Sequence, residues 1–320
     1  MRILLWHVHG SWTTAFVSGP HEYVVPVLPD RGPDGRGRAL TWDWPASVEE
    51  RTPQQLADED FDVVLLQRPH ELHDLCQRWT GRRPGRDVPA VYVEHNAPQG
   101  RIADMVHPAA DRDDLLVAHV TSFNELFWDC GTTPTRVVEH GVVDPGPRYT
   151  GELERAAVVI NEARRRGRVT GTDLLARFAG VPIDLFGMDA AALGGIEDLA
   201  QDRLHTEMAR RRCYLHPIRW TSLGLSLIEA MHLGMPVVAL ATTEAVEAVP
   251  PAAGVISTRI DVLVEAARGF IEEPGTAAEA GRAARAYALE RYGLERFLED
   301  WDDLLAEVIS DARGARLGAR

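Results

Sequence analysis

A glycine, a serine and a single glutamate share one short apolar stretch, TSLGLSLIEAMHLGMPVVAL, at residues 221–240. A helix that begins near Gly224 exposes unpaired backbone N–H groups at its first turn, where the helix dipole is positive. The amides of Gly224 and Leu225, with the Ser226 hydroxyl, therefore predict an anion-binding site. Glu229 lies one to two turns further along, where a carboxylate can accept hydrogen bonds from sugar hydroxyls. The pattern predicts a nucleotide site, with a diphosphate on the amides and a ribose on Glu229.

The same stretch leaves a second interpretation of Glu229 open. His232 follows three residues later, so Glu229 is equally explained as a surface carboxylate that pairs with His232 along the helix. Gly234 is expected to end the helix as its C-terminal left-handed residue, and Pro236 prevents its continuation.

Arginine is the only strong cation in the chain, because all 34 basic residues are Arg. Arg166 and Arg168 belong to a dense run, ARRRGR, at residues 163–168. Planar guanidinium groups bind phosphate through paired hydrogen bonds, so the run is a candidate diphosphate site. The alternative is a solvated helix start.

Two further candidates follow expected strands. His95 ends a strand and leads into a loop, at the edge where parallel sheets bind ligands. A packed structural histidine is the alternative there. Gly10 and Ser11 follow the first expected strand, where a Rossmann fold places its first ligand loop. The chain has no G-x-G-x-x-G motif, which argues against a dinucleotide.

No metal site is predicted. His7 and His9 alternate onto one face of the first strand, and packing explains them better than a metal pair. The acidic clusters at 111–114 and 300–303 are interpreted as solvated helix faces.

Composition narrows the partners and the compartment. A net charge of −14 argues against nucleic acid or an anionic membrane as the main partner. The start resembles a strand more than a signal peptide, and no run of about 18 apolar residues is present. Three dispersed cysteines suit a reducing compartment, so the chain is expected to be soluble and cytoplasmic; they are Cys76, Cys130 and Cys213. The oligomeric state is left open.

Short apolar runs alternate with helical stretches along the chain, which is typical of parallel sheets covered by helices. A first series of strands is expected at 2–8, 23–28, 62–67, 90–95, 115–121 and 135–140. A second series is expected at 156–161, 182–187, 213–217, 236–241 and 253–257. Helices are expected at 170–179, 197–211 and 277–310, a loop at 29–47, a linker at 140–152 and a frayed tail at 312–320.

The opening stretch resembles the donor-site signature of GT-B glycosyltransferases of family 4, roughly E-G-F-G-L-x-x-x-E-A-M-A-x-G-x-P-V-V. Gly224, Glu229, Gly234 and Pro236 all fall in register with it. Softer similarities cover most of the chain, at 92–98, 120–145 and 214–220.

Three positions depart from the family pattern. Thr221 replaces the first acid of the signature, which in the family contacts hydroxyls of the transferred sugar, and this points to an unusual donor. Thr170-Gly171 replaces the Lys-Gly that contacts the diphosphate. His140 stands where the family's interdomain N-G-V-D motif has Asn, and Asp144 matches its final residue.

The resemblance implies an α/β GT-B architecture, in which two Rossmann-like domains face a cleft. Residues 1–150 are expected to bind the acceptor, and residues 151–290 the nucleotide-sugar donor. Residues 291–320 are expected to form a helix that crosses back to the first domain, followed by the frayed tail.

The implied reaction is transfer of a sugar from a nucleoside-diphosphate sugar to a hydroxyl of a small molecule or glycan. Retention at the anomeric carbon, with no metal and no separate cofactor, is the family analogy. In the donor site Glu229 would hold the ribose, with Ser226 and Thr221 nearby. The Gly224 and Leu225 amides, with Arg166 or Arg168, would stabilise the departing diphosphate. His95, Gly10 and Ser11 would shape the sugar–acceptor side.

Two other functions remain open. A nucleotide-sugar 2-epimerase of the same fold would convert the donor without an acceptor. A catalytically silent sugar-nucleotide-binding protein is conceivable because of Thr221.

Overall fold

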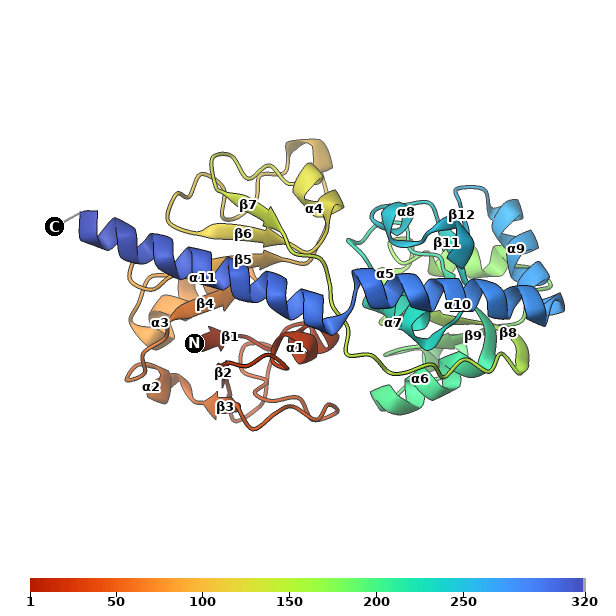
Figure 1. The fold of residues 1–320 in the computed structure, drawn as a ribbon, viewed down its shortest axis with the longest axis horizontal. Helices are drawn as coiled ribbons and strands as arrows, with labels where there is room; N and C mark the ends of the chain where they lie inside the picture. The colour runs from red at the N-terminus through yellow and green to blue at the C-terminus, as the bar shows by residue number, and fades with distance from the viewer. Residues whose placement is uncertain (319–320) are drawn as a thin grey trace. The chain divides into compact units, whose positions relative to one another are not determined.

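The computed structural model describes residues 1–318 and divides the chain into two compact units (Figure 1). Unit 1 contains Met1–Gly141 and the segment that starts at Leu294, and unit 2 contains Val142–Gly293. Each unit has its own wholly parallel sheet with helices on both faces, which is the Rossmann-like arrangement. This confirms the predicted fold class.

The sheet of unit 1 has seven strands in the order β3-β2-β1-β4-β5-β6-β7. The strands are β1 Arg2–Leu5, β2 Glu22–Pro26, β3 Val48–Arg51, β4 Val63–Leu66, β5 Ala90–Glu94, β6 Leu116–His119 and β7 Thr135–Val137. The helices are α1 Gly10–Phe16, α2 Pro53–Leu56, the π-helix η1 Glu71–Leu75, α3 Cys76–Thr80, η2 Ile102–Asp104, α4 Ser122–Phe127 and α11 Leu294–Gly318.

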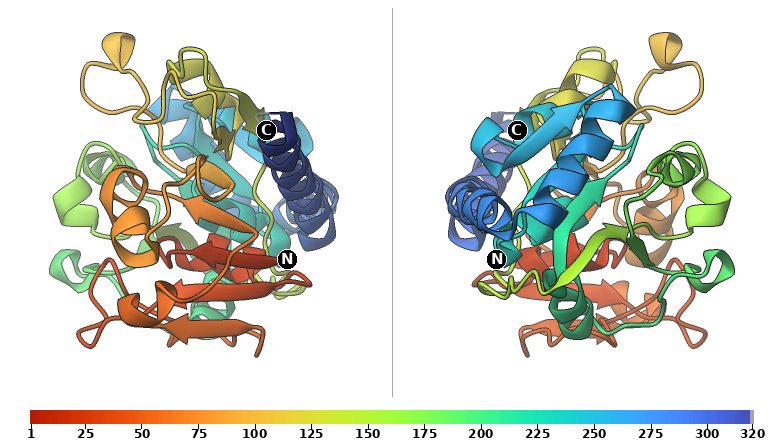
Figure 2. Two further views of the ribbon diagram at one scale, coloured as in Figure 1. Left: turned by 90° about the vertical axis from the view of Figure 1, so that its left-hand side faces the viewer. Right: turned by 90° about the vertical axis from the view of Figure 1, so that its right-hand side faces the viewer.

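Alternate strand residues of unit 1 point to opposite faces of the sheet, and each face is covered separately. Leu4 and Val64 pack with Leu72 and Cys76 beneath η1 and α3. The opposite face is covered by α1 and α11. Figure 2 shows the long helix α11 in dark blue beside the red and orange strands.

One strand of unit 1 was missed in the sequence. The segment of β3, VEER, has a single fully buried residue, Val48, followed by three charged residues that are only partly buried. It lies at the edge of the sheet and pairs with β2 alone. An edge strand that pairs on one side needs little apolar surface, so it has no hydrophobic alternation to detect.

The sheet of unit 2 has five strands in the order β12-β11-β10-β8-β9. They are β8 Leu153–Val159, β9 Ile183–Phe186, β10 Arg211–His216, β11 Val237–Leu240 and β12 Gly254–Ser257. The helices are α5 Ala163–Arg166, η3 Thr172–Arg177, η4 Ala191–Leu193, α6 Gln201–Arg210, α7 Leu225–Leu233, α8 Ala245–Ala248, η5 Pro251–Ala253, α9 Ile260–Glu272 and α10 Pro274–Arg291.

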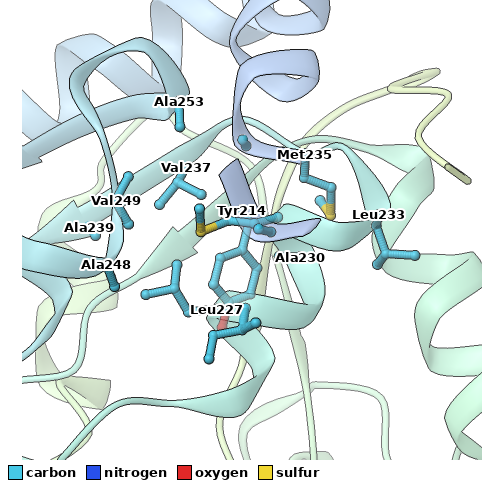
Figure 3. Close-up of a cluster of buried hydrophobic side chains, with 14 of the residues drawn as sticks. Tyr214, Leu227, Ala230, Leu233, Met235, Val237, Ala239, Ala248, Val249 and Ala253 are labelled. Carbon is cyan, nitrogen blue, oxygen red and sulfur yellow. The ribbon is translucent and has the colours of Figure 1, made fainter. Parts of the chain in front are cut away.

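Helix α7 is packed into the core of unit 2. All of its residues from Leu227 to Leu233 are buried. Figure 3 shows Leu227 and Ala230 of α7 beside the Tyr214 ring of β10. The helix ends at Gly234, whose left-handed φ of 88° provides the predicted C-terminal cap. The opening stretch therefore forms the expected helix, with its first turn as the only accessible part.

Three helical expectations need correction. Residues 170–179 contain a 3₁₀ helix, η3, rather than an α-helix. The segment expected at 277–310 is two helices, because the chain breaks at Tyr292 and Gly293 between α10 and α11. The acidic segment 111–114 lies in a turn, where Asp111 has a φ of 57°.

The expected frayed tail, 312–320, is also partly wrong. Helix α11 continues through these residues to Gly318, and the last two residues lie outside the described part of the chain. Within unit 1, α11 packs on α1 through Trp12, Phe297 and Trp301, whose rings meet edge to face. His21, which directly precedes β2, contacts Asp302 at 2.8 Å.

The contact between α7 and α10 predicts a stability effect. A Cβ at Gly281 in α10 would lie 2.0 Å from the carbonyl oxygen of Gly234. We therefore expect Gly281→Ala to lower the free energy of unfolding by about 1–3 kcal/mol, as overpacked cores do. Gly275→Ala in the same helix has open space around it, so it should be neutral or slightly stabilising. Urea unfolding of both variants measures this, and equal stability would mean that the two helices lie further apart than described.

Candidate active site

Unit 2 has one topological switch point, and both predicted donor elements lie at it. β8 is the first strand of this unit, with β9 on one side and β10 on the other. In open parallel sheets, ligands bind beyond the carboxyl ends of the strands where the order reverses in this way. The arginine run follows β8, and the turn that leads into α7 follows β10.

The segment that follows the arginine run is held against the turn after β10 by backbone and side-chain contacts. The Val169 carbonyl accepts the N–H groups of Arg219 at 2.9 Å and Trp220 at 3.1 Å. The Arg219 guanidinium donates to both carboxylate oxygens of Asp173, at 2.5 and 2.9 Å. Gly171 has a φ of 73°, and a Cβ there would lie 1.8 Å from the carbonyl oxygen of Pro217. Only glycine fits this position, which explains why Gly171 is glycine but does not explain Thr170.

The structure distinguishes Arg166 from Arg168, which the sequence left as equal candidates for the diphosphate contact. Arg166 is half-buried, and burial with the neighbouring Arg165 lowers its pKa. Within residues 1–318 its guanidinium has no hydrogen bond or ion pair. The side chain of Arg168 is 79% exposed and lies 3.4 Å from Asp173. A half-buried cation without a counterion is costly, so Arg166 is the better candidate for an anionic ligand.

The N-cap residue of α7 has no side chain with which to cap the helix. It is Gly224, so it makes no side-chain hydrogen bond to the N–H groups that follow it. The φ of Gly224 is an ordinary −72°, so backbone conformation does not require glycine here. A Cβ at this position would lie 2.8 Å from Cε1 of His216. His216 is buried, and burial lowers its pKa to about 4. Gly224 therefore makes room for a neutral imidazole beneath the turn.

Glu229 is a buried residue, which rules out its interpretation as a surface partner of His232. Only 4% of it is exposed, and its Oε2 accepts a hydrogen bond from Nε2 of Gln201 at 3.1 Å. Nε2 of His205 lies 3.4 Å from the same oxygen. His232 instead contacts the carbonyl oxygen of Ile228 at 3.0 Å.

Gln201 and His205 were missed in the sequence. Both lie on α6, four residues apart, in a segment that reads as an ordinary amphipathic helix. Only the packing of α6 on α7 brings them to Glu229. The Ser226 hydroxyl lies 2.9 Å from the Tyr214 hydroxyl, and Thr221 is half-buried in the turn before α7.

In unit 1 the sheet order reverses at β1, between β2 and β4, and the predicted residues lie near that edge. Gly10 and Ser11 form the first turn of α1 rather than a free loop. His95 directly follows β5.

His95 lies in a cluster of packed rings. Its ring centroid is 4.2 Å from His9, 4.9 Å from Trp12 and 6.5 Å from His140. Burial lowers the pKa of His9 to about 4, that of His140 to about 3, and that of His95 well below its usual value. All three imidazoles are therefore neutral at pH 7, and within the described chain His95 Nε2 has no hydrogen-bond partner.

His7 and His9 have different packing partners. Nδ1 of His7 contacts the carbonyl oxygen of Gly37 at 3.0 Å, and its ring packs on Trp44. His9 stacks on His95 instead. Among residues 1–318 there is no group of three or more histidines, cysteines or carboxylates placed to hold a metal ion.

The predicted loop at 29–47 is pinned at the same edge of unit 1. The Arg38 guanidinium donates to the carbonyl oxygens of Trp44 at 2.6 Å and Pro45 at 2.9 Å. The Trp44 indole N–H donates to the Thr14 hydroxyl in α1 at 2.8 Å. The loop therefore places aromatic side chains near Gly10, and hydrogen bonds hold the loop there.

Comparison with known proteins agrees with this geometry. Residues 196–287 match the family model of glycosyl transferases group 1. Sucrose-phosphate synthase from Thermosynechococcus elongatus superimposes with a TM-score of 0.73 at 13% identity, over 97% of this chain and 100% of that chain. Anabaena HepE in complex with UDP-glucose gives a TM-score of 0.65 at 16% identity, over 97% and 100%. No curated protein matches the sequence.

Two Rossmann-like units of this topology give the chain the GT-B fold, and a segment of the second unit matches the group 1 glycosyl transferase family. The matched segment contains α7, Glu229 and the α6 residues that contact it. No helix in the described part of the chain is both long and apolar enough to cross a membrane.

Proposed function

We propose that unit 2 binds a nucleoside-diphosphate sugar and that the enzyme transfers its sugar to a hydroxyl group of a small-molecule or glycan acceptor. One observation supports this most strongly. Arg166, a half-buried arginine without a counterion among residues 1–318, and the helix start at Gly224, whose N-cap residue has no side chain, follow the two strands of one switch point. Because Anabaena HepE forms a complex with UDP-glucose, UDP is the first nucleotide to test.

Each donor-site residue has a proposed role. The α7 amides at Gly224 and Leu225 and the Arg166 guanidinium neutralise the diphosphate as it leaves. Glu229 accepts the ribose hydroxyls, and Gln201 and His205 hold its carboxylate in place. With these groups on the diphosphate, the proposed reaction uses no metal and no separate cofactor. Arg168, at the exposed end of the run, adds a second positive charge near the diphosphate.

Unit 1 supplies the sugar and acceptor side in this proposal. His95 Nε2, a buried ring nitrogen without a partner among residues 1–318, hydrogen-bonds the transferred sugar. Gly10 and Ser11 shape the neighbouring edge together with the loop at 29–47. Retention at the anomeric carbon follows the family analogy, and product stereochemistry by NMR tests it.

Thermal unfolding against UDP, GDP, ADP and dTDP tests the donor site. Saturation at about 100 times the dissociation constant adds roughly 2.7 kcal/mol to the stability of the binding unit. We expect one nucleotide to stabilise the wild type and Glu279→Ala, an exposed position on α10, but not Glu229→Ala. If no nucleotide stabilises the wild type, the donor-site proposal is wrong.

Product analysis then separates the three candidate functions. With the preferred nucleotide bearing different sugars, a transfer product that requires acceptor extract identifies a glycosyltransferase. Conversion of the donor sugar without an acceptor identifies an epimerase. Nucleotide binding without either product identifies a silent binding protein.

A further inference from the structure

Several hydrogen bonds from within unit 1 hold the turn that carries His95. Glu94 is the last residue of β5, and only 4% of it is exposed. Its Oε1 accepts the backbone N–H of Asn96 at 2.7 Å. The carboxylate therefore spans His95 and fixes the direction of the chain on both sides of it.

His107 holds the other oxygen of this carboxylate, and its tautomer can be deduced. The backbone N–H of Ala109 donates to Nδ1 of His107 at 3.0 Å, so Nδ1 is the acceptor. Nε2 therefore carries the hydrogen and donates to Oε2 of Glu94 at 3.1 Å. The His107 ring is fully buried between Tyr92 and Trp128, which meet it edge to face at 4.8 and 5.1 Å.

The backbone carbonyls of the same turn are held by α4 and the residue after it. Nδ2 of Asn124 donates to the carbonyl oxygen of Glu94 at 3.2 Å. The Trp128 indole N–H donates to the carbonyl oxygen of Asn96 at 2.7 Å. These four hydrogen bonds are all made within unit 1, while Nε2 of His95 is buried and has no partner within the described residues.

A rigid support beneath one unused polar atom is the arrangement expected around a functional side chain. We propose that Glu94 and His107 are positioning residues that hold the His95 ring for the sugar-transfer step. This inference rests on the proposed function of His95, and it adds two residues that act through the turn rather than on the substrate.

Glu94→Gln is the direct test, because the variant keeps the side-chain shape but removes one of two acceptors. The new amide N–H₂ faces either the Asn96 N–H or the His107 Nε2–H, and both are donors. The matched control is Asp114→Asn, which breaks the contacts to Arg86 and Arg112 in the same unit. Asp114 precedes β6, at the opposite end of the strands from His95.

Two measurements are made on the full chain. The first is turnover of a sugar nucleotide, with the base chosen as the one that stabilises the wild type in thermal unfolding. We expect Glu94→Gln to lower kcat about 10- to 100-fold with little change in nucleotide affinity, because small misplacements of a reacting group cost this much. Asp114→Asn should lose less than twofold per folded molecule.

The second measurement needs no substrate. Burial holds the pKa of His95 well below its usual value. Loosening the turn admits water, so the His95 pKa, followed by NMR, should rise in Glu94→Gln and stay low in Asp114→Asn.

The outcomes separate this inference from the proposed function. If the wild type binds no nucleotide, the proposed function fails, while the His95 titration still reports on the turn. If Glu94→Gln has the turnover and the His95 titration of Asp114→Asn, the positioning role is wrong. Should Glu94→Gln not fold, Trp128→Phe removes the indole donor to Asn96 together with part of the ring that packs on His107, and it should shift both readouts in the same direction by a smaller amount.

Discussion

Arg166→Ala is expected to lower kcat/KM for the donor by about 10²–10³-fold, equivalent to roughly 2.7–4 kcal/mol, the usual loss when one preorganised charge-stabilising group is removed. Arg166 is the one arginine of its run that is half-buried and has no counterion within residues 1–318. The Arg166 guanidinium would stabilise the charge that develops on the leaving diphosphate, in a partly desolvated environment where electrostatic interactions are strong. Steady-state kinetics with the preferred sugar nucleotide measures the effect.

Arg165→Ala is the matched control for this variant. Its guanidinium is exposed and already donates to the Glu162 carboxylate at 2.8 Å, so its removal should change kcat/KM by less than about threefold. Equal losses in the two variants would mean that the run acts only through its total charge. Loss in Arg165→Ala alone would exclude Arg166 as the diphosphate contact.

Acid is expected to destabilise unit 1 through its buried histidines. Burial lowers the pKa of His140 from its usual 6.5 to about 3. The unfolded chain therefore binds a proton between pH 6.5 and 3 that the folded chain excludes. Stability from this residue is complete above pH 6.5 and is lost as the pH falls, with a slope of up to about 1.4 kcal/mol per pH unit.

His140→Asn removes this titration and places the family's residue at the position. We expect the pH dependence of the unfolding free energy between pH 6 and pH 4 to become shallower by about 1.4 kcal/mol per pH unit. Tryptophan fluorescence reports on the correct unit, because only Trp220 of the eight tryptophans lies in unit 2. His73→Asn, at an exposed position, should leave the slope unchanged. An unchanged slope in His140→Asn would show that His140 is already hydrated in the folded protein.

The strand rhythm and the donor helix were readable because they depend on local pattern. Apolar runs such as 62–67 form strands wherever they bury both faces, and Gly234 followed by Pro236 ends a helix by local backbone preference. β3 was not readable, because an edge strand with one buried side chain has no pattern. The break at Gly293 was hidden by the strongly helical composition on either side.

The candidate site divides in the same way. The residue types were readable: a glycine at a helix start, a lone glutamate in an apolar helix, an arginine run and a histidine at a strand end. Their relationships were not. Gly224 leaves space for the His216 ring, and Gln201 of α6 donates a hydrogen bond to Glu229. Arg166 is distinguished from Arg168 only by burial and by the absence of a counterion among the described residues.

By itself, the sequence determined two parallel α/β units and a donor-type motif, because backbone preference and hydrophobic period act over a few residues. The tertiary structure alone decided which charges are buried, which tautomer His107 adopts and that Nε2 of His95 has no partner among residues 1–318. Those properties depend on groups brought together from distant parts of the chain, such as Gln201 and Glu229, and on the water that their packing excludes.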